Sequence, residues 1–224
     1  MPRANRIDVG NVVYHVINRA NARMEIFADT KDYKLFEKVL EEAREKFDMR
    51  ILSYLVMPNH WHLVLYPKTD GDLQKFMGWV SMTHTQRWHS QHKTIGSGHL
   101  YQGRYKSFPI QTNRYLLQIF RYVERNALRA KLVKRAEDWE WSSLYRRENG
   151  SIEQKKLLSR WPIDIPADYI KIVNEAQTNV EVESLRYSVN KGKPYGSDGW
   201  VSKMIDTFGL TSTLRNPGRP NKGS

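Results

Sequence analysis

The sequence predicts an α+β protein with a ferredoxin-like fold, meaning an antiparallel sheet of the split βαβ (RRM- or palm-like) type with helices on one face. Runs rich in β-branched and aromatic residues predict strands, and apolar residues spaced by three and four predict helices. These segments follow one another in the order β-α-β-β-α-β, which defines that fold. Forty per cent of the residues are hydrophobic, enough to build a core. The fold class alone says little about function.

The first half of this pattern runs from residue 11 to the strand that begins at His60. Residues 11–18, "NVVYHVIN", are rich in β-branched and aromatic side chains and predict the first strand. Residues 29–47 carry apolar side chains at helical spacing. Residues 50–57, "RILSYLVM", are apolar on both faces, which is typical of a central strand. Pro58-Asn59 then predicts a tight turn back into the third strand.

The second half of the pattern contains a helix, an extended segment and a third helix. The helix is predicted over residues 72–92, and residues 99–111, "HLYQGRYKSFPIQ", predict an extended basic segment. Thr112 or Asn113 can cap a third helix that runs to about residue 130. We therefore expect one domain over residues 1–148.

Residues 149–224 are expected to form a C-terminal extension that ends in a basic Gly/Pro tail. This part of the sequence is poorer in strong periodicity, and it is interrupted by Pro162, Pro166 and Pro194. One short helix is predicted there, over residues 200–208.

The overall composition favours a polyanionic partner. The formal net charge is +12, with 36 Lys and Arg against 24 Asp and Glu, and nucleic acid is the first candidate for such a chain. There is no cysteine, which excludes disulfides and thiolate zinc sites. No segment is long and apolar enough for a bilayer, and the N-terminal residues lack a signal-peptide core. We expect a cytoplasmic protein without a membrane partner.

The stretch "PNHWHLVL" places two histidines on one face of a predicted strand. Side chains alternate along a strand, so His60 and His62 face one way while Trp61 and Leu63 face a buried layer. Two neighbouring imidazoles can bind one metal ion, although many such pairs are only hydrogen-bonded histidines. A metal site would also need a third ligand from elsewhere in the chain.

The third predicted helix offers a third ligand and a phenol. Tyr122 and Asn126 are four residues apart and share a helix face, so an amide oxygen and a phenol could lie beside the imidazoles. On spacing alone, a core aromatic and a helix-end residue explain these two positions better. Tyr115 lies two turns earlier on the same side of the helix, and helical geometry cannot choose between the two tyrosines.

Five segments in a fixed order resemble one protein family. "HVINR", "MPNHWHLVL", "YQGRYKSFPI", "RYLLQIFRYVERNALRAKLV" and "WEWSSLY" resemble the REP-associated tyrosine transposases, which belong to the single-tyrosine HUH endonucleases. The likeness runs from about residue 7 to residue 148, and some members have tails similar to "KGKPYGSDGWV" and "TLRNPGRPNK". Such proteins are metal-dependent transposases that cut single-stranded DNA at or near REP-like hairpins.

The resemblance implies a role for each candidate residue. His60, His62 and Asn126 become the ligands of one Mg²⁺ or Mn²⁺ ion, and Tyr122 becomes the nucleophile that forms a 5′-phosphotyrosine, with Tyr115 as runner-up. The family segment close to "RYIHLNPVRAGLV" aligns with "RYVERNALRAKLV" here. Ala127 therefore stands where proline is common, which removes a helix terminator but should not touch the chemistry.

The implied partner is single-stranded or hairpin DNA with REP-like palindromes, bound by a monomer or a homodimer associated with the nucleoid. Basic side chains could contact its phosphates and tyrosines could stack on its bases. The candidates are Tyr101, Arg104, Tyr105, Lys106, Arg114, Arg121 and Arg129. In the C-terminal tail, Arg215, Arg219 and Lys222 would carry a motif like an AT-hook, which enters a narrow minor groove, or else they belong to a merely basic tail.

Two other function classes compete with the transposase interpretation. One is a non-catalytic protein that binds hairpin DNA or RNA with the same sheet, but binding alone needs neither the histidine pair nor Tyr122 and Asn126. The other is a metal-dependent hydrolase in which the tyrosine only orients water. That enzyme would form no covalent intermediate with DNA.

Overall fold

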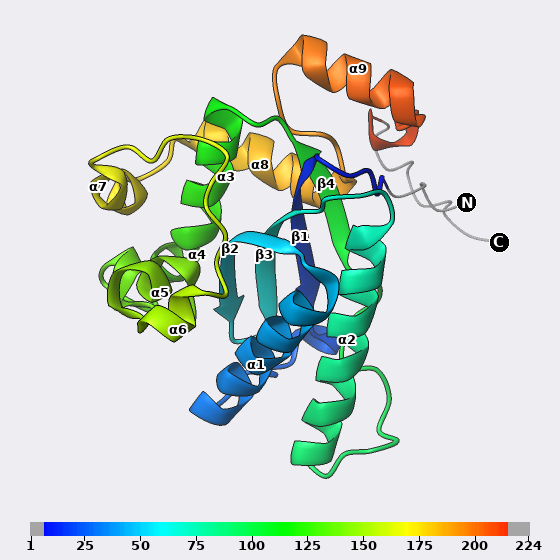
Figure 1. The fold of residues 1–224 in the computed structure, drawn as a ribbon, viewed down its shortest axis with the longest axis vertical. Helices are drawn as coiled ribbons and strands as arrows, with labels where there is room; N and C mark the ends of the chain where they lie inside the picture. The colour runs from blue at the N-terminus through cyan, green and yellow to red at the C-terminus, as the bar shows by residue number, and fades with distance from the viewer. Residues whose placement is uncertain (1–6, 215–224) are drawn as a thin grey trace, which may run out of the picture.

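The computed structural model describes residues 7–214, and its sheet has the predicted topology (Figure 1). Four antiparallel strands lie in the order β2-β3-β1-β4. They are β1 (Val13–Arg19), β2 (Arg50–Met57), β3 (His60–Tyr66) and β4 (Lys106–Ile110). Helix α1 (Thr30–Phe47) joins β1 to β2, and α2 (Asp72–Gln91) joins β3 to β4. This order confirms the ferredoxin-like α+β fold.

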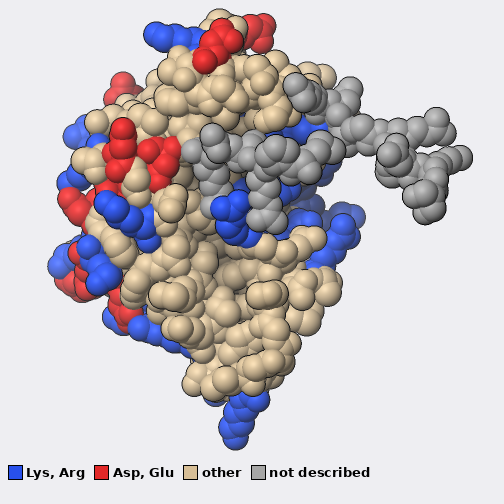
Figure 2. Space-filling view, turned by 90° about the vertical axis from the view of Figure 1, so that its right-hand side faces the viewer, with Lys and Arg blue, Asp and Glu red and all other residues tan. Residues whose placement is uncertain are grey.

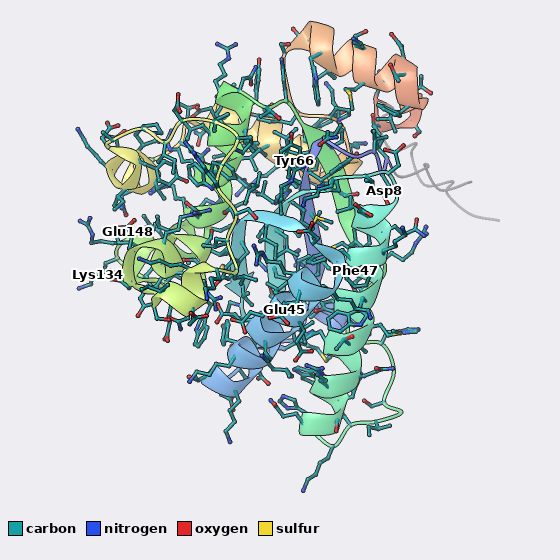
Figure 3. The ribbon with its side chains drawn as sticks, viewed as in Figure 1. Asp8, Glu45, Phe47, Tyr66, Lys134 and Glu148 are labelled. Atoms are coloured by element: carbon teal, nitrogen blue, oxygen red, sulfur yellow. The ribbon has the colours of Figure 1, made fainter. Side chains whose placement is uncertain are left out.

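Capping by carboxylates explains where the first two helices begin. Asp29 accepts hydrogen bonds from the backbone N–H groups of Lys31 and Asp32, which satisfies the start of α1. Helix α2 begins after a glycine that has no capping side chain. There the carboxylate of Asp8 accepts from the N–H groups of Leu73 (3.1 Å) and Gln74 (2.8 Å), from a segment distant in sequence (Figure 3).

Helices α1 and α2 pack on one face of the sheet, as the sequence predicts for the helices of this repeat. They cross in front of the strands in Figure 1. The buried layer beneath them includes Tyr14, Trp61 and Leu63. Phe47 at the end of α1 meets two aromatic rings of α2 edge-on and joins the two helices (Figure 3).

The opposite face of the sheet is covered as well, so the helices of the whole protein are not confined to one face. Val13, Val64 and Phe108 form a second core with α3 (Arg114–Glu124) and with parts of the C-terminal extension. His60 and His62 point into this side, and His62 is only 2% exposed. The histidines therefore lie beneath α3 and the extension and not on an open sheet surface.

The remaining helices are short, and most belong to the extension or lead into it. They are α4 (Asn126–Arg129), α5 (Ser143–Asn149), α6 (Ile152–Lys155), α7 (Tyr169–Asn174), α8 (Asn179–Lys191) and α9 (Asp198–Phe208), with 3₁₀ turns η1 (Asn21–Arg23), η2 (Ala136–Asp138) and η3 (Thr211–Leu214). Within residues 7–214, no helix combines the length and the apolar character needed to cross a bilayer.

Helix α9 confirms the one helix predicted after residue 151, whereas the prediction misses α8. Helix α8 buries only Leu185 and Ser188, so its apolar periodicity is too weak to detect. A capping signal was nevertheless present. Thr178 and Glu181 form a capping box at its start, and Gly192 ends it with a left-handed φ of 69°.

A buried carboxylate fixes α3 to the rest of the protein. Glu124 is fully buried, and its Oε1 accepts hydrogen bonds from the hydroxyls of Ser53 on β2 (3.0 Å) and Ser143 on α5 (2.7 Å). Its Oε2 accepts from the Tyr169 hydroxyl on α7 at 2.6 Å. Burial raises the pKa of Glu124, while these hydroxyls and Arg147 oppose the rise. One side chain thus ties α3 to the sheet and to the extension.

Replacing Glu124 tests this tie. Glu124→Ala should lower the free energy of unfolding by about 3 kcal/mol, because it leaves buried hydroxyls without their acceptor. Glu124→Gln should cost clearly less, since its amide oxygen still accepts. Urea denaturation followed by circular dichroism measures both. Equal losses in the two variants, or a loss under about 1 kcal/mol for alanine, would contradict this role.

Candidate functional site

The strand register places the two histidines beside β1. Arg19 pairs with His60 and Ile17 with His62 across the β1–β3 ladder, so all four side chains share one face of the sheet. The two imidazole rings are 5.1 Å apart between centroids. This agrees with the side-by-side placement expected from the strand period.

A third histidine, His15 on β1, belongs to the same cluster and was missed in the sequence. It is fully buried, and its Nε2 lies 2.9 Å from Nδ1 of His62. The two rings stack with centroids 5.0 Å apart. The only signal in the sequence was its position within "HVINR", because the contact depends on how β1 and β3 pair.

The hydrogen bonds around His62 determine where its proton lies. Arg129 Nη2 donates to Asn126 Oδ1 at 2.8 Å, which turns the amide nitrogen of Asn126 toward His62 Nε2 at 3.1 Å. Since that nitrogen is a donor, Nε2 must be the acceptor and the ring proton sits on Nδ1. His62 therefore donates to His15. Burial, aided by nearby positive groups, lowers the pKa of His62 well below its usual range, and burial lowers that of His15 to about 3.

His60 is held in the same tautomer as His62. Its Nδ1 lies 2.7 Å from Oδ1 of Asn59, an acceptor, so Nδ1 carries the proton. Burial, with help from the charges of Arg19 and Arg129, lowers the pKa of His60 to about 4. Both His60 and His62 are thus neutral at pH 7 and keep the Nε2 lone pair, the form in which imidazole binds a metal.

The structure brings Tyr122, and not Tyr115, to the histidines. The Tyr122 ring meets those of His62 and His15 edge-on at 6.1 and 6.4 Å, and the guanidinium of Arg129 lies 4.4 Å from its centroid. Tyr122 is 5% exposed. Tyr115 instead packs against Tyr195 in the extension, with ring centroids 5.4 Å apart.

The helix that carries Tyr122 is interrupted before Asn126. Helix α3 ends at Glu124 and α4 begins at Asn126, two residues after Glu124, so the chain already changes helix before Ala127. Arg121 and Arg125 of this segment donate to backbone carbonyls of residues 173–176 in the extension. The guanidinium of Arg121, predicted to bind DNA, is therefore occupied by the extension.

Tyr101 is a correction to the expected DNA contacts. It lies on the opposite side of the sheet from the histidines, 8% exposed, and its hydroxyl bonds to Trp61 Nε1 at 2.9 Å and His84 Nδ1 at 2.7 Å. A ring packed in this core cannot stack on a base. The sequence placed it correctly in an extended aromatic segment but could not show which way the ring points.

The other expected DNA contacts occupy different places. Arg104 and Lys106 are exposed at the edge of the sheet, where Tyr105 is buried beside them. Arg114 is exposed at the start of α3, with its guanidinium near Tyr115. Arg129 lies inside the site. Arg215, Arg219 and Lys222 fall outside the described residues.

Asn126 is the side chain that could add a third ligand to the two imidazoles. Among residues 7–214, no group of three or more His, Cys, Asp or Glu is placed to bind one. Two imidazole nitrogens plus the Asn126 oxygen make a three-ligand set that suits a divalent ion. The oxygen now accepts from Arg129, so Asn126 would have to turn it toward His62.

The comparisons with known proteins concern the family and the fold. The model of a family described as IS200-like transposases matches residues 8–126, over half of the chain. No curated protein sequence matches. Among solved structures, a REP-associated tyrosine transposase bound to a REP hairpin shares the fold, with 20% identity over 65% of this chain and 84% of its own, and a TM-score of 0.55. A protein assigned as a transposase from Deinococcus radiodurans R1 is 20% identical over 55% of this chain and 96% of its own, with a TM-score of 0.40.

The buried neutral histidines should make the protein sensitive to acid. Since the folded-state pKa of His15 is about 3, the unfolded chain binds more protons below about pH 6.5, and stability should fall as the pH drops from there. Each such histidine contributes up to about 1.4 kcal/mol per pH unit.

We expect His15→Gln to reduce the slope of the unfolding free energy against pH, between about pH 6 and pH 4, by up to about 1.4 kcal/mol per pH unit, the contribution of one histidine. Urea denaturation at several pH values measures it. Replacement of the exposed His99 by Gln is the matched control and should keep the wild-type slope. A wild-type slope in His15→Gln would refute this assignment.

Proposed function

The chain belongs to the IS200-like transposases, and we propose that it cuts and rejoins single DNA strands, with Tyr122 attacking a phosphate held beside His60, His62 and Asn126. The family membership makes it a DNA-processing enzyme. The observation that carries the finer proposal is the meeting of the Tyr122 ring with the rings of His62 and His15. A phenol beside two neutral imidazoles suits an attack on a phosphate held at that place.

The reaction exchanges one phosphoester for another. The Tyr122 oxygen bonds to the phosphorus as the bond to the 3′ oxygen breaks, which leaves a 5′-phosphotyrosine and a 3′-hydroxyl. The phenol proton is lost and the 3′ oxygen gains one. Attack by another 3′-hydroxyl on the phosphotyrosine reverses the step and joins two strands without any other energy source.

Arg129 supplies the positive charge next to the nucleophile. Its guanidinium faces the Tyr122 ring and is mostly buried, and burial lowers its pKa while the Tyr122 phenol opposes that effect. Within the described residues, its buried Nη1 has no hydrogen-bond partner. A buried, unused donor at this position supports a role in binding a phosphate oxygen.

One divalent ion, Mg²⁺ or Mn²⁺, fits the donor set. Both imidazoles have Nδ1 engaged, by His15 and Asn59, which orients each Nε2 as a ligand. Asn126 would supply the oxygen. When bound, the ion polarises the phosphate and stabilises the leaving 3′ oxygen.

We propose that the substrate is hairpin DNA with a single-stranded flank, of the REP-like kind. The solved structure with the shared fold was determined with a REP hairpin bound. Arg104, Lys106 and Arg114 are exposed and remain the proposed phosphate contacts. Such a substrate would place the protein at the nucleoid.

Covalent capture tests the nucleophile. The protein is incubated with Mn²⁺ and a hairpin labelled at its 3′ end, so that the label stays on the strand joined to tyrosine, and is then denatured. We expect a labelled protein band with wild type and Tyr115→Phe, and none with Tyr122→Phe.

Loss of the band only in Tyr115→Phe would contradict the assignment of Tyr122. Tight hairpin binding with no band in any of the three proteins would favour the non-catalytic binding protein. Cleavage without a band would favour the hydrolase.

Metal binding tests the role of His15 without relying on activity. Mn²⁺ titration followed by electron paramagnetic resonance should show that His62→Ala abolishes binding and that His15→Phe weakens it by about 10- to 100-fold, because His62 loses the partner that orients it. His84→Phe is the matched control, since His84 is equally buried on the opposite side of the sheet. Equal affinities of His15→Phe and His84→Phe would contradict an orienting role.

A further inference from the structure

A hollow of about 680 Å³ lies at the outer edge of β4, where the sheet and the extension meet. One wall comes from β1 and residues 102–109. The other comes from the end of α8, residues 189–192, and from η3. We call this hollow the extension groove. Its volume is in the range of pockets that bind small organic molecules or single nucleotides.

The charge of the extension groove selects an anion. Arg19, Arg104, Lys106 and Lys191 line it, and the described residues of its lining include no Asp or Glu, although the chain contains 24. On the face of the molecule seen in Figure 2, Lys and Arg lie both near the middle and along the left edge and bottom, whereas Asp and Glu lie toward the left edge and the top. A carboxylate-free lining with four cations suits a phosphate-bearing ligand.

The remaining lining suits a nucleotide better than a bare phosphate. The side-chain amides of Gln102 and Asn190 can donate to and accept from base edges. Ile17 and Val189 add apolar surface. Cations for the backbone, amides for base edges and apolar contacts for the base planes are the elements of a single-strand binding site.

The extension groove continues directly from the candidate active site. Ile17 lies opposite His62 on one side and opposite Lys106 on the other, so these three side chains form a row across β3, β1 and β4. Arg19 lies opposite His60 in the next position. Because Ile17, Arg19 and Lys106 all line the groove, a DNA strand that leaves the histidines reaches it by crossing one strand of the sheet.

The extension wall is held firmly against β4. Gly192 ends α8 close to the Ser107 carbonyl. Three residues later, the backbone of Tyr195 bonds to the edge of β4. Tyr195 N–H donates to the Pro109 carbonyl and Gln111 N–H donates to the Tyr195 carbonyl, both at 2.9 Å. These backbone hydrogen bonds therefore hold Asn190 and Lys191 beside the sheet.

We propose that the extension groove binds single-stranded nucleotides next to the phosphate that is cut, and that Asn190 and Lys191 give the extension a direct part in substrate binding. The proposal rests on the proposed function in one respect, namely that the single strand comes from the His60–His62 site. It assigns a binding role to a part of the chain that lies outside the family match.

Binding without cleavage tests this. Tyr122→Phe protein in EDTA is titrated with a fluorescent hairpin that carries a single-stranded flank of about six nucleotides, and with the same hairpin lacking the flank. Lys191→Gln and Asn190→Ala should each weaken binding of the flanked hairpin by about fivefold or more and leave the flankless hairpin unchanged. Lys191→Gln should also reduce the slope of log K against log salt by about 0.7, as expected for one lost single-strand phosphate contact.

Lys171→Gln is the matched control, because Lys171 is an exposed lysine of the extension on α7, away from the groove. Added to Tyr122→Phe, this substitution should leave the affinity for both hairpins unchanged. The proposal would be overturned if the groove variants lost equal affinity for both hairpins, or if neither variant lost affinity. It would also be overturned if polyglutamate displaced the flanked hairpin as effectively as an unlabelled oligonucleotide with the flank sequence. Since the binding assay needs neither Tyr122 nor metal, flank-dependent binding there, together with no adduct in the wild-type protein in the covalent-capture experiment, would reject the nucleophile and keep the groove.

Discussion

The buried contacts of His62 hold the functional side of this protein together. Through Nδ1 the ring bonds to His15 on β1, through Nε2 it meets Asn126 on α4, and its edge meets Tyr122 on α3. Two parts of the chain that lie far from β3 in the sequence, β1 and the adjacent helices α3 and α4, therefore converge on one imidazole. All of this depends on the β1–β3 register, because a shift by one residue would turn His60 and His62 to the other face.

The two sides of the sheet differ in the polarity of their buried side chains. Under α1 and α2 the layer is mostly apolar, and its few polar groups, such as Tyr101 and His84, bond to each other. Under α3 the layer contains histidines, the Glu124 carboxylate and Arg129, whose burial costs free energy unless partners satisfy them. The extension supplies several of these partners. Tyr169 bonds to Glu124, and carbonyls of residues 173–176 accept from Arg121 and Arg125, so the segment outside the family match positions the helix that carries Tyr122.

Sequence patterns were sufficient for the strands, the two helices of the repeat and the shared face of His60 and His62, because these depend on local periodicity. They could not decide between Tyr115 and Tyr122, which lie on one side of the same helix; the resemblance favoured Tyr122, and the structure brings that residue to the histidines. His15 escaped notice because its partner is 47 positions away and lies across a strand pair. Tyr101 was misplaced because strand residues face either side, and α8 was missed because its buried face is so small.

The central claim is that Tyr122 becomes joined to DNA at the histidine site. The most direct measurement is tandem mass spectrometry of protein that has reacted with a REP-like hairpin and Mn²⁺ and has then been digested with nuclease and protease. A nucleotide attached through its 5′ phosphate to Tyr122 is the expected result. A nucleotide attached to Tyr115 or to any other residue, or unmodified Tyr122 in protein that has cut the hairpin, would contradict it.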